Sequence, residues 1–131
     1  MRGGELMQVQ SISEEDGIKF LDLRELKTKT KGSKRMVPLH DKVASRVSFP
    51  LSTNQQRLNR IIRGQFDDVE VTLHSLRHTF KDLARDARIS EEVHKFITGH
   101  GTGDVSGNYG HGPSLKTRYD AIMSIPFPWI D

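Results

Sequence analysis

The chain has no cysteine among its 131 residues, so it can form neither a disulfide nor a zinc site built on thiolates. It also lacks any apolar run that approaches the roughly 20 residues needed to span a membrane. The first residues, Met-Arg-Gly-Gly-Glu, contain no hydrophobic region typical of a signal peptide. We therefore expect a cytoplasmic protein that has no membrane partner.

Positively charged residues only slightly outnumber negatively charged ones. Twenty Lys and Arg residues against 17 Asp and Glu residues give a net charge of +3, and the isoelectric point is about 9.3. This basic balance is compatible with a nucleic-acid partner. Hydrophobic residues make up 34% and charged residues 28%, and 131 residues suffice for one domain with a modest core. The sequence contains no internal repeat.

Four residues in the second half of the chain have side chains suited to phosphodiester chemistry. His74 and Arg77 are three apart on a predicted helix, so both project from one face. His100 follows Arg77 by 23 residues, and Tyr109 follows His100 by nine. A guanidinium can bind a phosphate, an imidazole can transfer a proton, and a phenol oxygen can attack phosphorus.

Each of these residues alone has a simpler interpretation. An H-x-x-R motif occurs by chance in many helices, and a single tyrosine more often packs than reacts. His74 and His78 have the i, i+4 spacing of a metal-binding pair, but the glutamate of a zinc-protease helix is missing. We therefore predict no metal site. The conjunction of the four residues favours the catalytic interpretation.

The order and spacing of His74, Arg77, Gly99-His100 and Tyr109 resemble those of the tyrosine recombinase, or phage integrase, family. The start of the chain carries a second element of the resemblance. Arg2-Gly-Gly-Glu5-Leu matches the latter part of a family motif that supplies the first catalytic arginine. The resemblance implies that Arg2 binds phosphate and that Glu5 supports it.

The basic segment 27–34 followed by Arg-Met-Val-Pro-Leu at 35–39 carries a third element. In the family, a hairpin of this form directs a lysine toward the cleaved bond. Lys29 matches that position best, and Lys27 and Lys31 remain alternatives.

The implied fold is mainly α with a small antiparallel β-sheet (α+β), as in the catalytic domain of this DNA breaking–rejoining family. The implied reaction is site-specific recombination or integration of double-stranded DNA for a phage or other mobile element. In it Tyr109 forms a 3′-phosphotyrosyl intermediate without metal or cofactor. His74 would accept the proton of Tyr109, and Lys29 would protonate the leaving oxygen. The implied catalytic residues are Arg2, Lys29, His74, Arg77, His100 and Tyr109.

Family members place a DNA-clamping domain before the first arginine, so the resemblance implies that residues 1–131 are a single, N-terminally incomplete catalytic domain. An inactive DNA-binding remnant and a type IB topoisomerase-like nicking–closing enzyme remain alternatives. The spacing from Gly-His to tyrosine favours the recombinase. The segment 114–131 is expected to form a helix and an apolar tail, which either packs on its own domain or joins protomers into a homotetramer on DNA.

Local patterns predict the remaining elements. We expect strands within 17–26 and 35–39. We expect a helix from a Ser52 cap to about Arg63 that buries Leu58, Ile61 and Ile62 and ends at Gly64. The other expected helices cover 1–10, part of 40–49, 74–87, 114–125, and a segment that starts at Ser90 and ends at Gly99.

Overall fold

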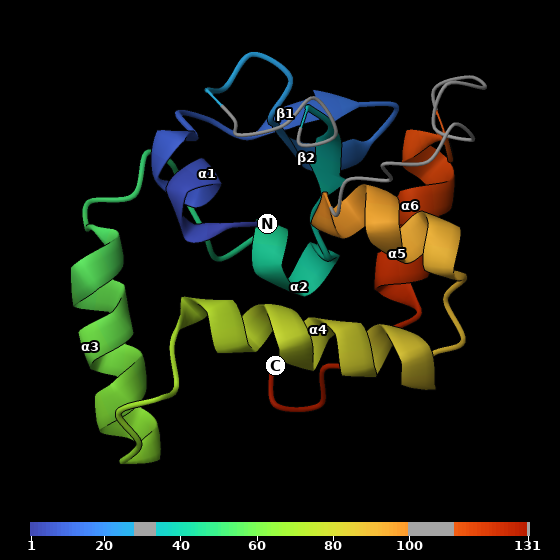
Figure 1. The fold of residues 1–131 in the computed structure, drawn as a ribbon. Helices are drawn as coiled ribbons and strands as arrows, with labels where there is room; N and C mark the ends of the chain where they lie inside the picture. The colour runs from blue at the N-terminus through green and yellow to red at the C-terminus, as the bar shows by residue number, and fades with distance from the viewer. Residues whose placement is uncertain (28–33, 100–111, 131) are drawn as a thin grey trace.

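The computed structural model describes residues 1–27, 34–99 and 112–130, and in these the chain has a mixed α+β fold (Figure 1). The six helices and one three-stranded antiparallel sheet of the described residues confirm the predicted α+β class. The elements are α1 (Gly3–Gln8), β1 (Ser13–Glu15), β2 (Ile18–Asp22), β3 (Met36–Pro38), α2 (Asp41–Ala44), α3 (Gln55–Phe66), α4 (Leu73–Asp86), α5 (Glu91–Thr98) and α6 (Leu115–Met123). None of the described helices is long and apolar enough to cross a membrane.

The sheet has the strand order β1-β2-β3, with both pairs antiparallel. The predicted strands within 17–26 and 35–39 are confirmed, and they pair with Leu21 opposite Val37. The first strand was not predicted, because Ser-Glu-Glu lacks the apolar alternation of a strand. A two-residue turn at Asp16 and Gly17, both with positive φ, joins it to β2, as expected for an Asp-Gly hairpin.

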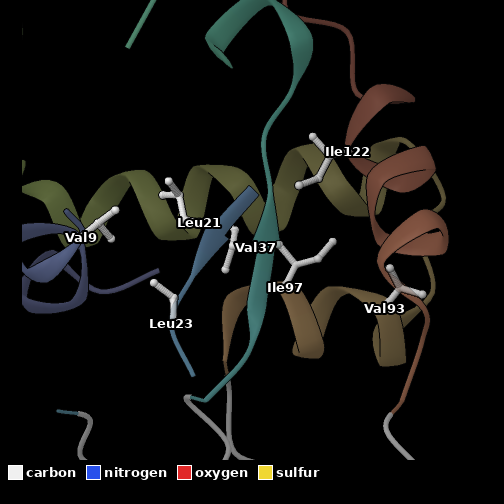
Figure 2. Packing of buried hydrophobic residues seen from close by; sticks show 7 residues of the cluster. All are labelled: Val9, Leu21, Leu23, Val37, Val93, Ile97 and Ile122. Atoms are coloured by element: carbon white, nitrogen blue, oxygen red, sulfur yellow. The ribbon is translucent and has the colours of Figure 1, made fainter. Parts of the chain in front are cut away.

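The hydrophobic core lies between the sheet, α5 and α6. Leu21 and Leu23 are 2% and 0% exposed. They belong to a cluster whose members come from segments far apart in the sequence: Val9, Leu21, Leu23, Val37, Val93, Ile97 and Ile122 (Figure 2). The long helix α4 runs beneath these elements, from its start near α3 to its end near α5 (Figure 1).

The helices that carry the predicted site begin at well-formed caps. At the start of α4 the Thr72 hydroxyl accepts a hydrogen bond from the His74 N–H, and the Ser75 hydroxyl accepts one from the Thr72 N–H. At the start of α5 the Ser90 hydroxyl accepts a hydrogen bond from the Val93 N–H. The helix ends at Gly99, whose φ of 70° suits glycine. Both helices are therefore confirmed.

The prediction for α3 is wrong in both bounds and in its buried face. Asn54 caps the helix through its side-chain oxygen, and the helix continues past Gly64 to a left-handed Asp67. No α3 residue is buried, and Ile61 is 51% exposed. Periodicity identifies an apolar face but not the element that would cover it. In addition, Ser52 and Asn54 are both good capping residues, so the start was ambiguous.

The tail after α6 packs on α2 of the same chain. Ile125 is 1% exposed, and the ring of Phe127 meets the edge of the His40 ring at 5.1 Å. The Lys42 ammonium donates a hydrogen bond to the Phe127 carbonyl oxygen at 3.3 Å. Among the apolar residues of α6 only Ile122 is buried. Packing of the described tail within its own chain is thus observed, while docking of the tail on another protomer stays a prediction.

Candidate functional site

The start of α4 presents two of the predicted residues in different environments. His74, one turn before Arg77, is exposed, and its ring lies edge-to-face on His78 at 5.0 Å. The Arg77 residue is only 7% exposed. The H-x-x-R spacing thus places an accessible imidazole beside a buried guanidinium.

Arg77 is buried, and no carboxylate among the described residues forms a hydrogen bond or ion pair with its terminal nitrogens. Neither of its terminal nitrogens has a hydrogen-bond partner among the described residues, and each exposes less than 1 Å². Burial lowers the pKa of Arg77, and the charges of Arg2 and Arg35 lower it further. An uncompensated buried charge costs several kcal/mol, so this group is a source of instability unless an anion reaches it.

Arg2 and Arg77 line one cavity of about 260 Å³. Most of its remaining wall is apolar and comes from α1, β3, α4, α5 and α6: Met1, Gly3, Leu6, Val37, Leu73, Leu76, Phe80, Ile97, Thr98 and Ile122. An apolar wall lowers the local dielectric and so strengthens the field of the two guanidinium groups. The cavity therefore offers two cationic groups in a mostly apolar setting.

A second cavity, of about 430 Å³, brings Arg2 together with His74 and Lys27. Two backbone hydrogen bonds hold Lys27 next to α1. Its N–H donates to the Gln8 side-chain oxygen at 3.0 Å, and the Gln8 amide donates to its carbonyl oxygen at 3.0 Å. Lys27 is the alternative lysine that the structure places near the arginines, whereas Lys29 and Lys31 lie outside the described residues.

Glu5 contacts two arginines. Its side chain accepts a hydrogen bond from the Arg2 N–H at 2.7 Å, and it lies 3.8 Å from the Arg2 guanidinium. Both terminal nitrogens of Arg35 also bond to its two oxygens, each at 3.3 Å. Burial acts to raise the pKa of Glu5, but the hydrogen bonds from Arg2 and Arg35 outweigh it and hold the pKa below its usual value.

Arg35 is a residue of this cluster that sequence reasoning missed. It is 5% exposed, and its Nε donates to the Ile97 carbonyl oxygen at 2.9 Å. The sequence places Arg35 at the start of the predicted strand 35–39, next to a basic segment, and assigns it no role in the site. The available signal was its position directly before the apolar strand Met36–Pro38. Three guanidinium groups and one carboxylate leave an excess of two positive charges here.

The remaining predicted residues His100 and Tyr109 lie outside the described part of the chain. The other tyrosine, Tyr119, donates its hydroxyl to Asp41 at 2.9 Å. This hydrogen bond, together with burial, raises the pKa of Tyr119. A raised pKa makes Tyr119 a poorer nucleophile than an unperturbed phenol.

Comparison with known proteins adds no family assignment. No protein-family model and no curated protein matches the sequence, and no solved structure matches the chain.

Proposed function

We propose that this chain is the catalytic domain of a tyrosine recombinase that acts on double-stranded DNA. The observation that carries the proposal is the buried Arg77 guanidinium, which lacks a partner among the described residues and shares a cavity with Arg2. The motif spacing that links these residues to His100 and Tyr109 supplies the second support.

The two arginines suit the binding of a scissile phosphate. The pentavalent transition state carries extra negative charge on its non-bridging oxygens, and preorganised guanidinium groups stabilise that charge. Arginine stays charged and can donate two parallel hydrogen bonds. Because the terminal nitrogens of Arg77 are almost inaccessible, contact requires its side chain to turn into the cavity it lines. Side-chain changes of this kind are common on binding.

In the proposed reaction the Tyr109 oxygen bonds to phosphorus and the bond from phosphorus to the 5′ oxygen breaks. His74 accepts the phenol proton, since a neutral imidazole can act as a general base. A lysine of the basic segment, Lys29 or the alternative Lys27, gives a proton to the leaving oxygen. The 5′-hydroxyl of a partner strand then attacks the 3′-phosphotyrosyl link and releases Tyr109.

Covalent trapping on a nicked suicide substrate tests the proposal. The protein should form a DNA adduct that Tyr109→Phe abolishes and that the matched control Tyr119→Phe retains. Binding without any adduct would favour an inactive DNA-binding remnant. Adduct formation and religation without strand exchange between two duplexes would favour the topoisomerase-like alternative. An adduct carried by Tyr119 would refute the assigned nucleophile.

Assembly into a homotetramer through 114–131 belongs to the same proposal. The observed contacts of the tail with α2 mean that exchange between protomers must first break them. Lys42→Ala removes the ammonium that holds the Phe127 carbonyl oxygen and should therefore favour assembly on DNA. Analytical ultracentrifugation of the DNA complex measures this. Unchanged assembly in Lys42→Ala and in a chain that lacks 126–131 would rule out a role for the tail.

A further inference from the structure

We propose that Arg35 is a positioning residue that fixes Arg2 and Arg77 relative to each other, an inference that rests on the proposed function. Arg35 does not line the cavity between these two arginines. Instead it binds two segments that both contribute residues to the cavity wall, α1 and the end of α5.

The contact with α1 runs through Glu5. The Arg35 guanidinium bonds to both oxygens of Glu5, and Glu5 accepts the backbone N–H of Arg2. This geometry fixes the first turn of a helix only six residues long, too short to be stable alone. The position of the Arg2 side chain therefore depends on Arg35 through Glu5.

The contact with α5 runs through its last turn. Arg35 Nε donates to the Ile97 carbonyl oxygen, and Ile97 and Thr98 line the cavity with Arg77. Gly99 packs directly on the guanidinium, so closely that a Cβ at this position would collide with it. A planar fork with five donors can satisfy Glu5 and Ile97 at once, which an ammonium cannot do.

Arg35 also determines which arginines Glu5 pairs with. Glu5 is the carboxylate that acts on Arg77, and its charge raises the Arg77 pKa against the lowering by Arg2 and Arg35. As long as Arg35 bonds to both Glu5 oxygens, Glu5 pairs with Arg35 and Arg2 and makes no hydrogen bond to the terminal nitrogens of Arg77. Loss of Arg35 alone would leave Glu5 to bind them in place of a phosphate.

The charge-neutral double variant Arg35→Met with Glu5→Gln tests positioning separately from folding. Exchanging a buried ion pair for neutral groups of similar volume is often neutral for stability. We expect this variant to fold with a lower melting temperature, because the Ile97 carbonyl oxygen loses the Arg35 donor, and to bind a DNA duplex within about 3-fold of the wild-type affinity. Its rate of adduct formation should fall about 100-fold, the order expected for a misplacement of about 1 Å.

The single variant Arg35→Lys provides the conservative comparison. Lysine can still pair with Glu5 but cannot also reach the Ile97 carbonyl oxygen, so we expect an intermediate rate. The matched control is Arg118→Lys, since Arg118 is also 5% exposed but donates to the Met36 and Ser114 carbonyl oxygens instead of to Glu5 and Ile97. If Arg118→Lys lowers the rate of adduct formation as much as Arg35→Lys does, general destabilisation and not positioning causes the loss.

A readout independent of cleavage separates this inference from the proposed function. Inorganic phosphate can be titrated while the Nε–H NMR signal of Arg77 is followed. The double variant should bind phosphate more weakly by at least about 3-fold, whether or not the wild type forms an adduct. A wild type that never forms an adduct refutes the proposed function alone. Wild-type phosphate affinity in the double variant would overturn the role of Arg35.

Discussion

Arg77 and Arg118 are almost equally buried, yet replacing each by methionine should change stability in opposite directions. They are 7% and 5% exposed, and burial lowers the pKa of both. Arg118 donates to the Met36 carbonyl oxygen at 2.7 Å and to the Ser114 carbonyl oxygen at 3.4 Å. The terminal nitrogens of Arg77 have no hydrogen-bond partner among the described residues. Comparing the two variants therefore shows how hydrogen-bond partners of a buried arginine affect the free energy of unfolding when burial is nearly the same.

The magnitudes follow from this difference. Arg77→Met removes an uncompensated charge and fills much of the same volume, so the free energy of unfolding should rise by about 1–3 kcal/mol. Arg118→Met loses charge-assisted hydrogen bonds and leaves a buried carbonyl oxygen without a donor. It should lower the free energy of unfolding by about 2–4 kcal/mol. Each kcal/mol moves the melting temperature by about 4 °C in a domain of this size.

Urea and thermal unfolding, each followed by circular dichroism, measure both changes. Phosphate should stabilise the wild type by about 1.4 kcal/mol at ten times its dissociation constant. It should not stabilise Arg77→Met, because that variant lacks the group that binds the anion. If Arg77→Met destabilises the protein as much as Arg118→Met, or if phosphate stabilises Arg77→Met equally, the assignment of Arg77 as an anion-binding group is wrong.

Three further predictions follow from the same site. Glu5 has a lowered folded-state pKa, so it adds stability above its unfolded value of about 4.3 that is lost as pH falls through the folded value. Acid titration should therefore destabilise the wild type more steeply than Glu5→Gln. A DNA substrate with a 5′-bridging sulfur needs no general acid. It should therefore restore the cleavage rate of whichever variant, Lys29→Ala or Lys27→Ala, lacks the acid. An equal loss of rate on the sulfur substrate and on normal DNA would exclude that role for the lysine. DNA binding should weaken steeply with salt and show little sequence preference, which nanomolar selective binding at physiological salt would contradict.

Sequence reasoning worked where local signals decide structure. The caps at Thr72 and Ser90 and the glycine at 99 define α4 and α5 by hydrogen bonds within a few residues. It failed for α3, where the burial of Ile61 depends on which other element packs there. It also missed the polar strand β1, which forms because a tight turn brings it back onto β2. Packing against distant elements decided the error in the buried face of α3, whereas β1 pairs locally with β2 across the turn at Asp16 and Gly17.

In the candidate site, too, sequence reasoning found residues that belong to a local motif and missed contacts between distant segments. The H-x-x-R spacing identified Arg77, but no local pattern could show that it is buried whereas His74 is exposed. The partners of Arg35 are 30 and 62 residues away in the sequence, so its contacts with Glu5 and Ile97 were beyond any motif. Charged residues near a predicted turn are usually solvated, so the buried ion pair between Arg35 and Glu5 was not predicted.

The distribution of partners within the cluster explains how a net positive charge persists inside a folded domain. One carboxylate, Glu5, lies among three guanidinium groups, and it bonds by its two oxygens to Arg35, which does not line the cavity. Arg77, which does line the cavity, thus has no hydrogen-bond partner for its terminal nitrogens among the described residues. This arrangement is less stable than one in which Glu5 pairs with Arg77, because a buried unpaired charge is costly. A bound anion reverses that balance, since its oxygens supply the acceptors that Arg77 lacks. The arrangement of the described cluster is therefore better suited to binding negative charge than to maximal stability of the unbound domain.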